Sequence, residues 1–181
     1  MQSSRDKSFS LLLALVLGGA SLPALADDAC VDFKWDVSKE RALFAETPAQ
    51  VTAGKDPRTA PVVVPNRLYR LKLMAQDTVA FSVTNPAKKT TSTPAYAGLA
   101  LLKVPVTGSY RIAVDLPLWI DVAANGALVQ PADFQAQHAC NAPHKIVEFD
   151  LAGARPFVLQ FSNAGKDDVL LTVTPSPPRK L

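Results

Sequence analysis

Four side chains that can bind metal ions lie close together late in the chain: His138, Cys140, His144 and Glu148. Two histidines and one carboxylate form the ligand set of many non-haem iron oxygenases. His138, His144 and Glu148 therefore define one alternative hypothesis, a metal-dependent dioxygenase. We favour two solvated loop histidines instead, because the spacing matches no established metal motif and Cys140 is expected to form a disulfide. We predict neither a metal nor another cofactor.

Other catalytic chemistry has less support in the sequence. The carboxylates of Asp115, Asp121, Glu148 and Asp150 could supply an acid and a base for hydrolysis. They alternate with apolar residues, however, as outward-facing acids on β-strands do. A serine hydrolase is also not indicated, because the chain contains no G-x-S-x-G motif. We predict that the protein has no catalytic residues.

Four residues are candidates for ligand binding: Trp119, Asp121, Trp35 and Tyr96. Planar aromatic side chains beside polar groups can stack on sugar rings or fill pockets of partner proteins. Trp119 alternates with Leu118 and Ile120, so Trp119 and Asp121 would share an outer face if those two residues face the core. We favour burial of Trp119 over exposure, either against the other sheet or under the segment around Trp35.

Residues 1–26 have the three parts of an export signal peptide. Arg5 and Lys7 are basic, residues 9–17 are apolar, and Ala24-Leu25-Ala26 has the small-x-small pattern of a cleavage site. The apolar run is shorter than the ~20 residues that span a bilayer. We predict cleavage after Ala26, no integral membrane segment in the mature chain, and a periplasmic or secreted location.

The two cysteines of the chain, Cys30 and Cys140, should form a disulfide in that oxidising compartment. The chain carries 19 basic and 16 acidic side chains, a balance that favours no particular partner. The basic residues are scattered and have few aromatic residues among them, so nucleic-acid binding is not expected.

From about residue 66 onward, short runs of alternating apolar and polar residues are separated by turn residues. This period of two is typical of half-buried antiparallel strands. The runs cover residues 68–73, 79–83, 97–104, 109–115, 118–122, 127–130, 145–151, 157–162 and 169–174. Asn125-Gly126 lies between two of them and predicts a tight hairpin, because both residues tolerate a positive φ.

These patterns predict an all-β fold: an antiparallel, jelly-roll-like β-sandwich of about eight strands with a short N-terminal helix and one disulfide. The helix is expected at residues 36–45, with Asp36 or Ser38 at its start. The predicted divisions are a signal peptide at 1–26, an N-terminal segment with the helix and a proline-rich surface linker at 27–65, the sandwich at 66–175 and a flexible tail at 176–181. The disulfide would hold the N-terminal segment against the sandwich.

Two runs carry a resemblance to a known family. They are Leu68-Tyr69-Arg70-Leu71-Lys72-Leu73, followed by a second alternating run, and Gly108-Ser109-Tyr110-Arg111-Ile112-Ala113-Val114, with the pattern G-x-Y-x-I-x-V. Through them, residues 68–174 resemble the bacterial pre-peptidase C-terminal type of jelly-roll domain. Members of that family are typically noncatalytic appendages of secreted enzymes, and some bind polysaccharide or calcium, so the resemblance implies a binding or accessory role. This chain differs in having no protease domain and no acidic calcium loop. Residues 30–38 also resemble a segment of small uncharacterised proteobacterial periplasmic proteins.

The sequence as a whole predicts an exported, noncatalytic binding or interaction module of the cell envelope, with a glycan or a protein as its partner. A cupin-like dioxygenase that uses His138, His144 and Glu148 is the enzymatic alternative. A subunit that completes a larger envelope assembly is a third hypothesis. The sequence makes no prediction of the oligomeric state.

Overall fold

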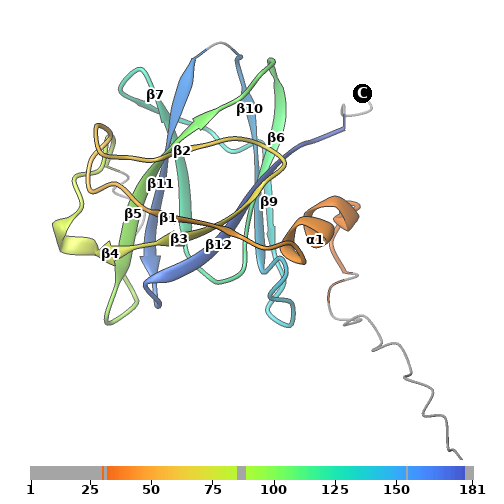
Figure 1. The fold of residues 1–181 in the computed structure, drawn as a ribbon, viewed down its shortest axis with the longest axis horizontal. Helices are drawn as coiled ribbons and strands as arrows, with labels where there is room; N and C mark the ends of the chain where they lie inside the picture. The colour runs from red at the N-terminus through yellow and green to blue at the C-terminus, as the bar shows by residue number, and fades with distance from the viewer. Residues whose placement is uncertain (1–29, 31, 85–88, 154, 178–181) are drawn as a thin grey trace, which may run out of the picture.

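A computed structural model describes residues 30, 32–84, 89–153 and 155–177, which form a two-layer β-sandwich (Figure 1). The predicted signal peptide lies outside the described residues. Within the described part there is one α-helix, α1 (Ser38–Phe44), and a short 3₁₀ turn, η2 (Gln76–Thr78). No helix of the described part is long and apolar enough to cross a membrane.

Each layer of the sandwich is one sheet. The first sheet contains β1 (Ala49–Thr52), β3 (Leu68–Lys72), β6 (Gly108–Val114), β9 (Asp133–Ala136), β10 (Lys145–Leu151) and β12 (Asp168–Pro175), in the order β1-β3-β12-β6-β10-β9. The second sheet contains β2 (Val62–Val63), β4 (Met74–Ala75), β5 (Tyr96–Lys103), β7 (Trp119–Ala124), β8 (Ala127–Val129) and β11 (Pro156–Ala164), in the order β2-β5-β11-β7-β8, with β4 also paired to β5. The predicted all-β sandwich with one short helix is therefore confirmed.

The strands differ from the prediction in number and in direction. The described residues contain twelve strands rather than about eight. Most pairs are antiparallel, but β1 runs parallel to β3 and β2 runs parallel to β5. Both are edge strands. β2 lies within residues 50–65 and β1 begins one residue before them, in the part of the chain predicted to be a surface linker. They are short and have prolines nearby, so they show little of the alternation by which strands are recognised.

The run at residues 79–83 was predicted to be a strand, and this prediction is wrong. Val79, Phe81 and Val83 are half-buried while Ala80 and Ser82 are more exposed, so the alternation correctly indicated which side chains face the protein. The backbone nevertheless forms no ladder with a neighbouring strand. Its hydrogen bonds go instead to a side chain of the second sheet and to the loop before β2.

One apolar core fills the space between the two sheets. On β6, Tyr110, Ile112 and Val114 point into this core, as the period of two predicts. The turn between β7 and β8 is the predicted hairpin turn, with Asn125 at φ 53° and Gly126 at φ 74°.

The N-terminal segment covers the outer face of the first sheet. Cys30, Phe33 and Val37 form a second apolar cluster there with Ala113, Cys140 and Ile146. The predicted disulfide between Cys30 and Cys140 is present, with a Cα–Cα distance of 5.1 Å. Helix α1 begins within the predicted range and packs beside β12 (Figure 1). The N-terminal segment is therefore held against the sandwich, as expected.

A buried charge cluster lies beneath this segment. The Arg111 guanidinium on β6 lies 3.3 Å from the Glu148 carboxylate on β10 and 3.9 Å from the Glu40 carboxylate on α1. It also donates a hydrogen bond of 3.1 Å to the carbonyl of Asp36. Glu40 accepts a hydrogen bond from Thr174 on β12. One guanidinium thus joins α1 to the sheet and offsets two buried carboxylates.

The disulfide should stabilise the fold measurably. We expect the Cys30→Ala/Cys140→Ala double variant to lose about 2–5 kcal/mol of unfolding free energy in urea denaturation, because its denatured chain is no longer cross-linked. Limited proteolysis should also cut the N-terminal segment of this variant faster. A reducing agent should lower the stability of the wild type and leave the variant unchanged. Equal stability of the two proteins would contradict this assignment.

Removing the buried guanidinium should cost more than removing an exposed one. We expect Arg111→Met to lower the unfolding free energy by about 3–5 kcal/mol, because the buried carboxylates of Glu40 and Glu148 would lose the guanidinium that they share. The matched control is Arg70→Met, whose ion pair with Asp168 is partly exposed and should contribute about 0–1 kcal/mol. Similar losses of unfolding free energy in the two variants would show that the buried Arg111 does not stabilise the contact between α1 and the sheet.

Candidate functional site

The exposed face of β7 carries the first two predicted ligand-binding residues. Ile120 and Val122 point into the core, so Trp119 and Asp121 project from the outer face of the second sheet. Trp119 is 38% exposed, which places it among the exposed large hydrophobic side chains. Trp119 and Asp121 therefore share the outer face, and the burial that we favoured for Trp119 is not observed.

The neighbouring strand β11 supplies polar groups in register with these two residues. Ser162 pairs with Trp119 and Gln160 pairs with Asp121 across the antiparallel ladder. Adjacent residues of such a ladder have side chains on the same face of the sheet. A row of aromatic, hydroxyl, amide and carboxyl groups therefore lies along the outer face.

The segment 79–84 forms a cover over this face, and the Gln160 side chain joins it to the second sheet. Gln160 is only 2% exposed, and its amide makes two hydrogen bonds with the backbone of Val83. The Val83 N–H donates to Gln160 Oε1 at 3.0 Å, and Gln160 Nε2 donates to the Val83 carbonyl at 2.9 Å. The paired amide replaces the strand ladder that residues 79–83 lack, and it places Phe81 at the rim of the site.

A bulge in β11 builds the opposite wall. The register of β11 against β5 shifts between Phe161 and Ala164, and Asn163 adopts a left-handed conformation with φ 58°. The Asn163 side-chain oxygen accepts hydrogen bonds from the N–H groups of Thr91 and Ser92 at 2.6 and 2.9 Å. One asparagine thus joins residues 91–92 to the strand that forms the floor.

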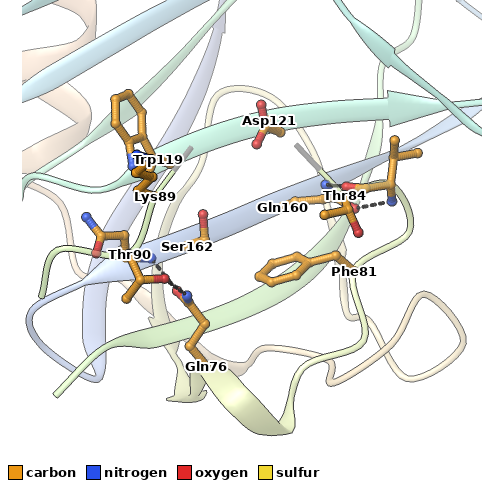
Figure 2. Close-up of a pocket in the computed structure, with 11 residues that line it drawn as sticks. Gln76, Phe81, Thr84, Lys89, Thr90, Trp119, Asp121, Gln160 and Ser162 are labelled. Atoms are coloured by element: carbon orange, nitrogen blue, oxygen red, sulfur yellow. Dashed lines mark hydrogen bonds between the residues drawn. The ribbon is translucent and has the colours of Figure 1, made fainter. Parts of the chain in front are cut away.

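These walls enclose a cavity of about 200 Å³, which we call the Trp119 cavity. Figure 2 shows Gln160 and Ser162 on β11 between Asp121 and Trp119 on β7 and Phe81 on the cover. Gln76 and Thr90 close one end and are joined by a hydrogen bond of 2.6 Å from Gln76 Nε2 to Thr90 Oγ1. The cavity combines two aromatic side chains with amide, hydroxyl and carboxyl groups, and it can take a small polar ring.

The other two predicted aromatic residues lie elsewhere. Trp35 is on the N-terminal segment, outside the first sheet, with Lys34 Nζ 4.8 Å and the Arg111 guanidinium 5.0 Å from its ring. It packs against the cluster around the disulfide. Tyr96, at the start of β5, packs against the main core and is not part of the Trp119 cavity. Neither residue is therefore brought together with Trp119 and Asp121.

The alternative metal ligands are not brought together either. The rings of His138 and His144 lie 5.7 Å apart, but Glu148 is four residues further along an extended chain, roughly 13 Å away at about 3.3 Å per residue. Glu148 is paired instead with Arg111. No group of three or more His, Cys, Asp or Glu side chains within the described ranges is placed to hold a metal ion. The geometry gives the dioxygenase hypothesis no support. The expectation of two solvated histidines is wrong for His144, which is only 5% exposed, whereas His138 is exposed.

Sequence reasoning missed Gln160, Ser162 and Asn163 as site residues. Gln160 and Ser162 are the polar positions of the predicted run 157–162, but nothing in the sequence showed that β11 lies beside β7. Asn163 offered a weak signal, since asparagine is the residue after glycine that most readily adopts a positive φ. Asn163 lies at the end of the alternating run 157–162, a position at which a β-bulge can occur.

Comparison with known proteins assigns no family to this chain. No protein-family model matches it, and no curated protein matches it. Among solved structures, it is similar to a beta-glucosidase from Kluyveromyces marxianus at 12% identity and a TM-score of 0.32. That match covers 46% of this chain and 11% of the glucosidase, so the chain spans a small part of that enzyme.

The paired amide of Gln160 should be required to hold the cover in place. We expect Gln160→Leu to lower the unfolding free energy by about 1–3 kcal/mol, since the N–H and carbonyl of Val83 would lose their partners. Hydrogen exchange at Val83 should become faster in the same variant. The matched control is Gln50→Leu, at an exposed position of β1, where little change is expected. Unchanged exchange at Val83 would contradict the role given to Gln160.

Proposed function

We propose that this protein is an exported, noncatalytic binding module of the cell envelope, and that the Trp119 cavity binds one sugar ring of a glycan. The observation that carries the proposal is the exposed Trp119 ring beside Asp121 and the cavity. Sugars present apolar C–H faces and equatorial hydroxyl groups, which an aromatic ring and neighbouring polar groups complement.

The size and composition of the cavity support a sugar ring over a larger ligand. Small-molecule sites are commonly about 300–1,000 Å³, and the Trp119 cavity at about 200 Å³ is smaller. It has room for a single ring, and its opening leaves the rest of a polymer outside. Ser162, Gln76 and Thr90 add hydroxyl and amide groups at its edge.

Export is supported by the disulfide and by the residue pattern of the first 26 positions. Disulfides persist mainly in oxidising compartments. The Cys30–Cys140 link closes most of the described chain into one loop. The accessory role implied by the pre-peptidase C-terminal resemblance agrees with a module that binds a glycan without cleaving it.

The test is a glycan-binding measurement on the mature protein. We expect wild-type protein to bind members of a panel of envelope and extracellular oligosaccharides, and Trp119→Ala to weaken binding by about tenfold or more, as loss of a central aromatic contact does. Trp119→Phe keeps a smaller ring and should lose less. Isothermal titration calorimetry gives the affinities, and circular dichroism shows whether the variants remain folded.

The matched control is Val106→Ala, which removes an apolar side chain that is 63% exposed and does not line the cavity. Its affinity should equal that of the wild type. The proposal fails if no oligosaccharide binds, or if Trp119→Ala and Val106→Ala bind as the wild type does.

A further inference from the structure

A second hollow, of about 440 Å³, shares Trp119 with the first cavity. Its apolar wall includes Leu118, Trp119 and Phe134, and its basic groups are His138, His144 and Lys145. We call it the basic hollow. It lies where β7 of the second sheet and β9 of the first sheet approach each other, so each sheet supplies one of its aromatic side chains.

Two exposed aromatic rings lie on this one hollow. Phe134 is 64% exposed and Trp119 is 38% exposed. The other exposed large hydrophobic residues among the described positions are the aliphatic residues Val62, Val64 and Val106. Exposed aromatic side chains that share a hollow are typical of a binding site, because each loses contact with water only when a ligand covers it.

The charged groups of the hollow are all basic. Lys145 Nζ lies 4.9 Å from the centroid of the Trp119 ring and donates a hydrogen bond of 2.8 Å to the Leu118 carbonyl. The rings of His138 and His144 are in edge contact at 5.7 Å. None of the described residues that line the hollow carries a carboxylate. Asp115 and Asp168 line an adjacent depression. There Asp115 accepts a hydrogen bond from the Leu170 N–H, and Asp168 accepts one from Arg70.

The three basic groups act on one another. Burial is the largest cause that lowers the pKa of His144, and the positive charges of His138 and Lys145 lower it further, whereas backbone hydrogen bonds with Cys140 and Gln137 raise it. His144 Nδ1 lies 3.3 Å from that carbonyl, which can only accept, so Nδ1 carries the proton. In the neutral ring Nε2 is then unprotonated. A negative charge placed in the hollow would relieve the repulsion among the three groups and favour protonation of Nε2.

We infer that the basic hollow binds the carboxylate of an acidic sugar, so that the natural ligand is a uronic acid glycan whose rings lie on both sides of Trp119. This inference rests on the proposed glycan-binding function and names the class of glycan. The Lys145 ammonium and the exposed His138 imidazole meet the carboxylate, and Trp119 and Phe134 meet the apolar face of the ring. Charge-assisted hydrogen bonds of this kind are stronger than neutral ones.

The experiment compares acidic oligosaccharides with their uncharged counterparts. The probes are trigalacturonate, trimannuronate and a hyaluronan tetrasaccharide, each also prepared as its methyl ester, which keeps the rings and removes the charge. Titration calorimetry is performed at pH 5.5 and pH 7.5. We expect at least one acid to bind the wild type about tenfold more tightly than its ester. Binding of the acid should strengthen as the pH falls, because a carboxylate in the hollow favours the protonated form of His144, whereas binding of the ester should change little.

Three variants separate charge from shape. Lys145→Met removes the charge with little change in volume, so it should lower affinity for the acid and leave affinity for the ester unchanged. Lys145→Arg keeps the charge and should retain most of the preference. Lys103→Met removes a lysine at the exposed end of β5, remote in the sheet from this hollow, and should behave as the wild type. Circular dichroism of each variant confirms folding.

The outcomes are distinguishable from those of the proposed function. Equal binding of acid and ester, or an unchanged preference in Lys145→Met, overturns this inference while glycan binding at Trp119 stands. The inference is also overturned, and the proposed function retained, if neutral oligosaccharides bind in a Trp119-dependent way and no acidic oligosaccharide binds. Absence of any glycan binding overturns both proposals. Binding of poly-glutamate alone, dependent on Lys145, would indicate an acidic protein partner and would overturn the acidic-sugar assignment.

Discussion

Apolar packing between the two sheets determines where every other side chain of the strands lies. Once Ile120 and Val122 are buried between the layers, Trp119 and Asp121 have only the outer face of the second sheet available. The same constraint on the first sheet places Tyr110 and Ile112 inside and Arg111 outside. A slip of one residue in either strand would exchange these faces, and the site would lose its aromatic wall.

Each outer face is covered by a segment that is not part of the ladders, and the two covers are held by different interactions. Over the first sheet, the disulfide and the buried Arg111 hold residues 30–44 by a covalent bond and by ionic contacts. Over the second sheet, the amide of Gln160 holds residues 79–84 by neutral hydrogen bonds. Neutral bonds contribute less to stability than a disulfide does, so the cover beside the Trp119 cavity is easier to displace than the N-terminal segment.

Much of this architecture could be predicted from local patterns, because the interactions that create them are local or chemically unambiguous. The alternation of Val147 and Phe149 records a face buried in the core. Asn125-Gly126 supplies the two positive φ angles of a hairpin turn. With only two cysteines in the chain, Cys30 and Cys140 could pair in one way.

The features that escaped prediction depend on which strands become neighbours. Arg111 and Glu148 are both visible as polar positions on strands, but their ion pair exists because β6 and β10 pair in a register that places them opposite each other. The binding site has the same origin, since Ser162 meets Trp119 only through the pairing of β11 with β7. Such contacts join distant positions, and no period within one strand encodes them.

The placement of Trp119 at the start of β7 explains how one ring can serve two hollows. A side chain in the middle of a strand has neighbours on both adjacent strands, so a ligand can contact only its tip. Trp119 lies at the strand end, with Ser162 in register on one side and the Lys145 ammonium 4.9 Å from its ring. Its ring therefore borders both the Trp119 cavity, which contains the Asp121 carboxylate, and the basic hollow. A polymer that crosses the ring would meet hydroxyl, amide and carboxylate groups at one unit and basic groups at the next, and such a surface distinguishes a charged glycan from a neutral one.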